Sequence, residues 1–473
     1  MPEVVLFPET VLILLFFALV IVLKSDTAAL YIIFTAVFML GILKFFDVPY
    51  IVVRSIKVYF ILLLFLKALI NESIIRKQPF ITFGLKPILL FVLITVVSAI
   101  INNVSVIAYW SFIHIPIADY LLLLAVLNLK IPQKKIRSVI RYLVILFLIQ
   151  IPAALVKLAI FRNVNTEGGG IGTIHMQEGS LSTILPMFAI GFVLSAYFYK
   201  KKTIYLFIVL GFVAFGIINA KRAIIFFIPL IYFIVQYLHT KRANANNFEF
   251  IRKNIFSKLA LTVGLACITF YAIARINPTL NPDRKIGGRF DLNYIMNFSN
   301  DYTSASKDNN LLKMRRRYAP KYFYNLLNGK GLDKLMLGMG PGDVVRSRFL
   351  YPDQDPMLTK YGVRYAGRLG IIWFFMQVGL IGLFFYFYFH FRLGKMIWSL
   401  YKKNPSIQYQ IIALGFIMAI FTFFIDNLIY STSMLKSGAL MTTYYYIAAL
   451  LIGKQYRGVF EPRYENDEQK LNF

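Results

Sequence analysis

Apolar residues in this chain come in long blocks, without the regular polar positions of helices that pack on the surface of soluble proteins. A bilayer core about 30 Å thick is crossed by about 17–25 residues of α-helix. Apolar windows of that order recur along the whole chain, at roughly residues 5–23, 28–43, 50–70, 85–101, 113–128, 140–160, 181–198, 203–217, 222–238, 257–275, 369–390, 408–427 and 433–452. The pattern predicts an all-α polytopic membrane protein with about 12–13 transmembrane helices.

One hydrophilic segment interrupts the apolar windows. Residues 277–368 contain 16 Lys or Arg and 8 Asp or Glu, and they predict a single long loop. The chain then divides into an N-terminal transmembrane helix bundle (1–276), the long loop (277–368), C-terminal transmembrane helices (369–453) and a polar tail (454–473).

Basic residues predict how these helices are oriented, because Lys and Arg concentrate in cytoplasmic loops. Basic clusters occur in every second loop between the windows, at residues 76–77, 130–141, 200–202, 241–258 and 392–403. We therefore expect all of them, and the C-terminal tail, in the cytoplasm. The loop 161–180, the turn 219–222 and the long loop then lie on the outer face.

Composition narrows the class further. Of 473 residues, 58% are hydrophobic and 15% charged, whereas soluble domains are about 45–50% apolar and about 25% charged. This composition argues against a soluble enzyme, and 45 Phe and 30 Tyr exclude disorder. The net charge is +29, but the chain has no separate hydrophilic domain that could bind nucleic acid with it. Nucleic acid is therefore not an expected partner. One cysteine, Cys267, excludes an intramolecular disulfide and a multi-cysteine metal site.

Arginines of the long loop are clustered in the sequence. This clustering favours an anion-binding site, and a solvent-exposed loop without a ligand is the alternative. Arg315, Arg316 and Arg317 are consecutive, and Arg364 and Arg368 precede the return to the membrane. Arginine presents planar paired donors that fit phosphate oxygens. Within the triple we expect one functional arginine and two surface ones. Neighbouring aromatic residues, among them Tyr361, suit stacking on sugar rings.

Two further features of the long loop are predicted from its pattern. The stretch YAPKYFYNLL, which begins at Tyr318, predicts a short amphipathic helix at the membrane interface. Gly338, Gly340 and Gly342 form neither a dinucleotide fingerprint nor a P-loop. They predict a tight turn over the membrane.

Arg222 is the strongest single candidate. With Lys221 it opens a window at the predicted outer face. A cation at a helix N-terminus is unfavourable by about 0.3–1 kcal/mol, and an outer Lys-Arg pair runs against the orientation rule. Because the pair opposes both the helix dipole and the orientation rule, we expect a functional role for Arg222. The alternative is that these side chains extend to the lipid headgroups.

Few acids or histidines are placed for proton transfer. His175 and Glu178 lie in the glycine-rich outer loop, and Asp291 and Asp301 in the long loop. Any of these four is a candidate general base. Glu9 and Asp426 are the acids expected within or at the edge of spans, where ionisable residues are functional candidates. His239 and His390 are expected at cytoplasmic helix ends, in a capping role.

Four stretches, in this order and spacing, resemble the O-antigen polymerase (Wzy-type) and O-antigen ligase superfamily over residues 145–395. They are IQIPAALVKLAIFRNVNTEGGGIGTIHMQEGSLSTILPMFAIGFVL, with its Gln-containing span and glycine-rich loop; INAKRAIIFFIPLIYF, with its basic turn; the basic long loop followed by GMGPG; and RLGIIWFFMQVGLIGLFFYF, the return helix. The resemblance implies a GT-C-like architecture in the cytoplasmic membrane of a bacterium. Its substrate would be a polyprenyl-pyrophosphate-linked glycan, polymerised on the outer face. Arginines can stabilise the leaving pyrophosphate, and the sequence has no evident external carboxylate cluster, so we expect no metal or cofactor.

On this resemblance the catalytic candidates are Arg222, Arg368, Glu178 and His175, and the substrate-binding candidates are Lys221, Arg289, Arg315, Arg316, Arg317, Arg364 and Tyr361. Ligases of the family begin the return helix with a His-Asn pair, and Arg368-Leu369 stands there instead. This departure favours a polymerase over a ligase. Membrane lipid and a chain-length regulator protein are candidate partners. A polysaccharide flippase or other transporter is the remaining alternative, although no repeated halves are evident.

Overall fold

The computed structural model describes residues 18–39, 42, 50–129, 131, 133–160, 172–174, 180–218, 223–243, 264, 267–268, 270–271, 274–275, 280–285, 287–303, 306–308, 311–314, 316–344, 356–361, 363–365 and 369–456. Six helices in these ranges are long and apolar enough to cross a membrane: Ile56–Ile75, Val106–Asn128, Ser138–Val156, Leu181–Lys200, Gly370–Lys403 and Ile407–Tyr430. Four shorter apolar helices accompany them: Ser25–Phe38, Leu85–Ile101, Ile204–Gly216 and Gly438–Gly453. A polytopic, predominantly helical membrane protein is therefore confirmed, and the count of 12–13 spans stays a prediction.

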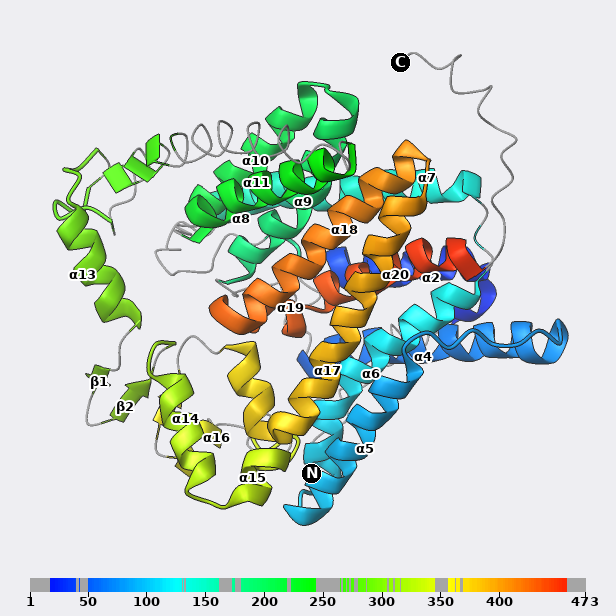
Figure 1. The fold of residues 1–473 in the computed structure, drawn as a ribbon, viewed down its shortest axis with the longest axis horizontal. Coiled ribbons are helices and arrows are strands. Elements are labelled where there is room, and N and C mark those ends of the chain that lie inside the picture. The colour runs from blue at the N-terminus through cyan, green and yellow to red at the C-terminus, as the bar shows by residue number, and fades with distance from the viewer. Residues whose placement is uncertain are drawn as a thin grey trace.

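The N-terminal half consists of helices alone in its described parts (Figure 1). They are α2 (Ser25–Phe34), the π-helical η1 (Thr35–Met39), α4 (Tyr50–Leu69), the π-helical η2 (Ile70–Ile75), α5 (Leu85–Ile101), α6 (Val106–Asn128), α7 (Gln133–Leu148), α8 (Gln150–Ile160), α9 (Leu181–Lys200), α10 (Ile204–Ile218) and α11 (Ala223–Ala243). Ser105 starts α6 as an N-cap, since its hydroxyl accepts from the Ala108 amide at 3.3 Å.

The C-terminal half adds the elements of the long loop and the last helices. They are α13 (Leu292–Thr303), β1 (Ser306–Asp308), β2 (Leu311–Met314), α14 (Ala319–Asn328), α15 (Leu332–Leu337), α16 (Pro356–Tyr361), β3 (Val363–Tyr365), α17 (Gly370–Lys403), α18 (Ile407–Ile425), the π-helical η3 (Asp426–Tyr430), α19 (Ser433–Lys436) and α20 (Gly438–Tyr456). β2 pairs antiparallel with β1 and parallel with β3.

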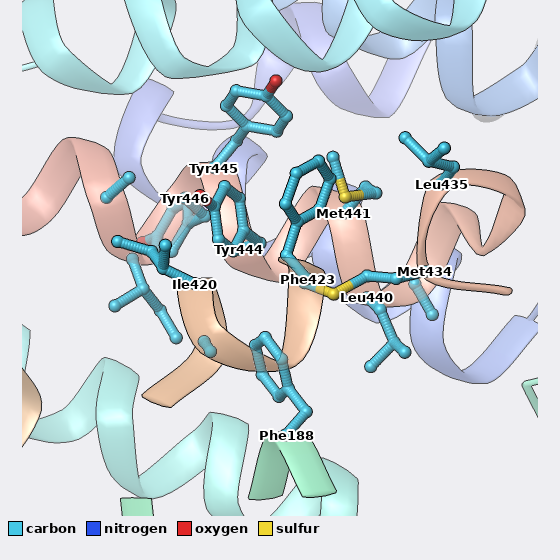
Figure 2. Close-up of a cluster of buried hydrophobic side chains, with 14 of the residues drawn as sticks. Phe188, Ile420, Phe423, Met434, Leu435, Leu440, Met441, Tyr444, Tyr445 and Tyr446 are labelled. Carbon is cyan, nitrogen blue, oxygen red and sulfur yellow. The ribbon is translucent and has the colours of Figure 1, made fainter. Parts of the chain in front are cut away.

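The core forms where α18 packs on α9 and α17, and where α20 packs on α6 and α18. Figure 2 shows Phe188 of α9, Phe423 of α18 and Tyr444 of α20 converging in it. All three side chains are almost completely buried. Aromatic side chains bury large areas each, so this cluster joins the first half of the chain to α18 and α20.

Two contacts between helix ends join segments that are far apart in the sequence. Arg242, at the end of α11, donates from Nε to the Tyr401 carbonyl at 3.0 Å and from Nη2 to the Asn404 carbonyl at 2.9 Å. Both segments are predicted to be cytoplasmic. Between α5 and α6, Asn102 accepts from Lys334 Nζ of the long loop at 2.6 Å. Of these two segments, the long loop is predicted to lie outside.

The predicted glycine turn is present and is docked against the helices. Gly338, Gly340 and Gly342 have φ values of 78°, 109° and 96°, which L side chains rarely adopt. A Cβ at Gly338 would lie 2.6 Å from the Gln377 carbonyl carbon, and one at Gly342 would collide with the Ala108 backbone. Glycine is therefore required for close backbone approach as well as for turn conformation.

The return helix α17 is broken at Gly379, where the sequence predicted one continuous window. Gly379 has φ 62° and ψ −167°, and a Cβ there would collide with the Met336 carbonyl. The break accommodates the end of α15, which Figure 1 shows at the bend. The Met339 amide donates to the Met376 carbonyl at 2.7 Å and so fastens the turn to the broken helix.

The amphipathic stretch after Tyr318 forms the predicted helix, α14, and its position at the membrane interface stays a prediction. Its buried side chains, Ala319, Phe323 and Leu327, recur every fourth residue and pack toward α15 and α17. The apolar face of α14 is therefore covered by the protein.

We expect Gly342→Ala to lower the thermal stability of the purified protein more than Gly287→Ala. Both glycines have positive φ, which costs about 1–2 kcal/mol for another residue. A Cβ at Gly287 meets nothing within 4 Å, whereas Gly342→Ala also overpacks against the Ala108 backbone, adding about 1–3 kcal/mol. Equal melting temperatures for the two variants would show that the turn is not docked as described.

Reporter fusions test the predicted orientation. A fusion after residue 300, in α13, should report the outer side, and a fusion after residue 455, at the end of α20, the cytoplasm. Paired reporters active on opposite sides, such as alkaline phosphatase and a fluorescent protein, give the readout. The same signal at both positions would contradict the orientation.

Candidate functional site

Four distant segments meet around Tyr430, at the end of the π-helical turn η3. The Tyr430 hydroxyl and the Thr183 hydroxyl of α9 lie 2.8 Å apart. The Phe227 ring of α11 meets the Tyr430 ring edge-on at 5.8 Å between centroids. The Arg316 guanidinium of the long loop lies over the Tyr430 ring at 4.5 Å. We call these four residues the Tyr430 junction; π-helical turns of this kind occur frequently at functional sites.

A buried carboxylate holds the chain reversal beside the junction. Asp426 is fully buried, and its Oδ2 accepts from the Met434 amide at 2.6 Å. Its backbone carbonyl accepts from the Ser431 amide, also at 2.6 Å. Asp426, predicted as a functional acid at the edge of a span, thus fixes the backbone between η3 and α19.

The start of the return helix packs on the same turn. The Gly370 amide donates to the Ser431 carbonyl at 3.0 Å. A Cβ at Gly370 would collide with the Asn427 side-chain oxygen, so only glycine lets α17 begin this close to η3. The first residue of α17 is therefore anchored within one residue of Tyr430.

Of the two described arginines of the triple, one lies at the junction. Arg316 is half-buried over Tyr430, where a cation gains about 0.5–2 kcal/mol from the ring face. Arg317 is exposed, and its Nη1 donates to Asn300 Oδ1 at 3.3 Å. Arg315 lies outside the described residues. That one arginine of the triple is functional and two lie on the surface stays a prediction.

Several sequence-predicted residues lie outside the described part of the chain. They are Arg222, Lys221, Arg368, Glu178, His175, Arg315 and Glu9. Arg364 lies on β3, where its Cα pairs with that of Lys313 on β2.

Tyr361 and Arg289 are described, and each lies in a different part of the long loop. The Tyr361 hydroxyl and the Lys360 ammonium both donate to the Asp343 carboxylate, directly after the glycine turn. Tyr361 therefore braces that turn. Arg289 is exposed, and its amide donates to Asp283 Oδ2 at 2.7 Å. The adjoining Phe290 packs on a separate small apolar cluster.

The two loop carboxylates proposed as bases are positioned differently. Asp291 Oδ1 accepts from the Tyr294 amide at 3.0 Å, which is the geometry of an N-cap for α13. Asp301 lies exposed on the same helix. N-capping of α13 accounts for an aspartate at position 291, so no role in proton transfer is needed to explain it.

Sequence reasoning missed a buried ion pair inside the helix bundle. Lys57 Nζ of α4 and Asp119 Oδ1 of α6 lie 2.7 Å apart, and both side chains are almost completely buried. The prediction named Glu9 and Asp426 as the intramembrane acids and is therefore incomplete. A lysine and an aspartate in two apolar windows were the available signal, because such residues pair or serve function.

His390 is also placed differently from its prediction. It lies inside α17, which continues to Lys403, so the helix-end position is wrong. Its Nδ1 lies 3.1 Å from the Tyr444 hydroxyl and its Nε2 lies 3.4 Å from the Tyr445 hydroxyl. Its ring stacks on Phe423, with centroids 4.0 Å apart.

The glutamine of the first resembling stretch holds the glycine-rich loop. Gln150 is fully buried; its Oε1 accepts from the Thr173 amide at 2.8 Å and its Nε2 donates to the Thr173 hydroxyl at 3.0 Å. A Cβ at Gly172 would lie 2.5 Å from Gln150 Oε1. The loop that leads toward α9 is thus tied to α8.

Comparison with protein-family models, with curated proteins and with solved structures gives no match. Among the described residues, no three His, Cys, Asp or Glu side chains group as metal ligands would.

Removing one partner of the buried ion pair should destabilise the protein. Asp119→Asn leaves the Lys57 ammonium buried without its counter-ion, at a cost of about 3–5 kcal/mol. The double variant Lys57→Met/Asp119→Leu should recover most of that loss, because no buried charge remains. Thermal unfolding in one detergent measures the cycle. If Asp119→Asn melts like the wild type, the pair does not form.

Proposed function

We propose that the protein polymerises polyprenyl-pyrophosphate-linked oligosaccharide units into a surface polysaccharide, as a membrane glycosyltransferase with a GT-C-like architecture. The observation that supports it best is the Tyr430 junction. It joins the segments in which the resemblance to O-antigen polymerases places the catalytic residues. Such a polymerase acts at the outer face of the bacterial cytoplasmic membrane.

Several candidate residues are close in sequence to described residues at or beside the junction. Arg368 is two residues before Gly370, and Arg222 and Glu178 are each five residues before a junction residue, Phe227 and Thr183. Together with Arg316 they would supply three cations and one acid.

The proposed reaction uses these groups in defined roles. An acceptor sugar hydroxyl attacks the anomeric carbon of the donor, a new glycosidic bond forms, and the bond to the lipid pyrophosphate breaks. Negative charge grows on the leaving pyrophosphate, so Arg316, Arg222 and Arg368 stabilise the transition state more than the bound substrate. Glu178 or His175 takes the proton of the acceptor hydroxyl.

Tyr430 supports this chemistry by fixing one cation. Its hydroxyl is held by Thr183 and its ring lies beneath the Arg316 guanidinium. A pre-placed arginine requires little reorganisation when charge develops. The proposal needs no metal or cofactor, and its partners are the lipid-linked glycan, membrane lipid and a chain-length regulator.

A transporter of lipid-linked glycan is the second candidate, and one observation favours it. The Lys57–Asp119 pair and His390 place ionisable groups inside the helix bundle, where transporters keep their coupling sites. A ligase is the third candidate, and Arg368-Leu369 at the position of its His-Asn pair disfavours it.

Purified protein in liposomes, given only lipid-linked repeat units, should produce a ladder of longer glycans, and the ladder should persist in EDTA. Arg316→Ala should slow elongation about 100- to 1000-fold, as loss of one charge-stabilising donor does. Arg316→Lys should rescue little, because a point charge does not replace paired donors. Arg284→Ala, at an exposed cation of the same loop, is the control and should elongate normally.

Other outcomes separate the alternatives. Movement of the unit across the liposome without elongation indicates a transporter. Single transfer to a different lipid acceptor indicates a ligase. Elongation by Arg316→Ala at the wild-type rate would remove the junction from the mechanism, and loss of the ladder in EDTA would overturn the metal-free reaction.

A further inference from the structure

The outward face of α14 combines side chains that suit a sugar chain. Lys321, Tyr324, Asn325 and Asn328 are spaced i, i+3, i+4 and i+7, so they share one face of the helix. All four are exposed, whereas Ala319, Phe323 and Leu327 on the opposite face are buried. We call these four residues, with Tyr318 at the N-cap, the outer face of α14.

Two half-exposed tyrosines distinguish this face from an ordinary solvated helix. Tyr324 keeps 50% and Tyr318 48% of its surface exposed, although neither is needed to cover the core. Residues 318–330 contain two Lys and no Asp or Glu. Tyrosine offers a large rigid ring at low entropy cost, and asparagine offers adaptable hydrogen bonding. Ring faces and amides match the two surfaces of a pyranose, its C–H face and its hydroxyl edge.

The position of this face relative to the Tyr430 junction identifies the occupant. Arg316 at the junction is two residues before Tyr318, so the face begins where the proposed pyrophosphate site ends. The ten residues of α14 extend about 15 Å from that point. This length accommodates more than one sugar ring. The apolar side of α14 is already buried against the protein, so the face open to a ligand is polar and aromatic.

We propose that the outer face of α14 binds the glycan part of the substrate, with Tyr324 stacking on a pyranose ring and Asn325 and Asn328 bonding its hydroxyls. This inference rests on the proposed function and names the subsite for the sugar chain. A glycan held there stays near the junction between additions. The face therefore controls how many units are added before release, while the arginines control the rate of each transfer.

Chain length and first-transfer rate, measured separately, test the subsite. In the liposome assay, Tyr324→Ala should form the first linkage within about two-fold of the wild-type rate but give shorter chains. Tyr324→Phe should keep the wild-type length because its ring face remains. Tyr59→Ala, at a tyrosine of α4 that is 47% exposed, is the matched control. Wild-type lengths for Tyr324→Ala would overturn the subsite, whereas absence of any ladder in the wild type would overturn the proposed function.

Direct binding provides a second measurement that does not depend on turnover. The probe is the free oligosaccharide of the repeat unit, without lipid or pyrophosphate, detected by saturation-transfer NMR with the protein in nanodiscs. Tyr324→Ala should bind it roughly five- to ten-fold more weakly, as expected for loss of one aromatic contact. Unchanged binding contradicts the proposal. An effect of the substitution that appears only in nanodiscs with anionic lipid also contradicts it, because the face would then anchor to headgroups.

Discussion

Backbone-to-backbone contact between the glycine turn and the broken return helix is the constraint on which the long loop depends. Gly338 and Gly342 approach main-chain atoms of α17 and α6 so closely that no Cβ fits, and Gly379 breaks α17 at the same place. Asp343, directly after the turn, is held by Lys360 and Tyr361 of α16. The loop is thereby fixed at its middle to the bundle. Arg316 precedes this anchor in the sequence, and its guanidinium lies over one face of the Tyr430 ring.

Two polar centres of different kinds follow from the packing. The Tyr430 junction lies where helix ends meet, and the Lys57–Asp119 pair lies between two spans. At the junction Arg316 is half-buried, so it stays available to an anionic ligand. The ion pair is enclosed and internally neutralised, which suits a structural clamp better than a binding site. This difference is the physical reason to place the proposed chemistry at the junction.

Sequence reasoning found the long apolar helices, the glycine turn and α14, because hydrophobic block length, glycine spacing and amphipathic periodicity are local signals. It could not pair Lys57 with Asp119, which are 62 residues apart in chain position, or place His390 between Tyr444 and Tyr445. Tyr430 escaped notice because one tyrosine at the end of an apolar window resembles an interfacial residue. Its importance comes from three partners that only the fold assembles.

Photocrosslinking with a polyprenyl-pyrophosphate-linked glycan that carries a diazirine next to the pyrophosphate tests the central claim most directly. The account predicts label in peptides that contain Thr183, Phe227, Arg316 or Tyr430, and competition by unlabelled lipid pyrophosphate. Label confined to peptides of α4, α6 and α20, around Lys57 and Asp119, would contradict it and would place the substrate inside the bundle, as in a transporter.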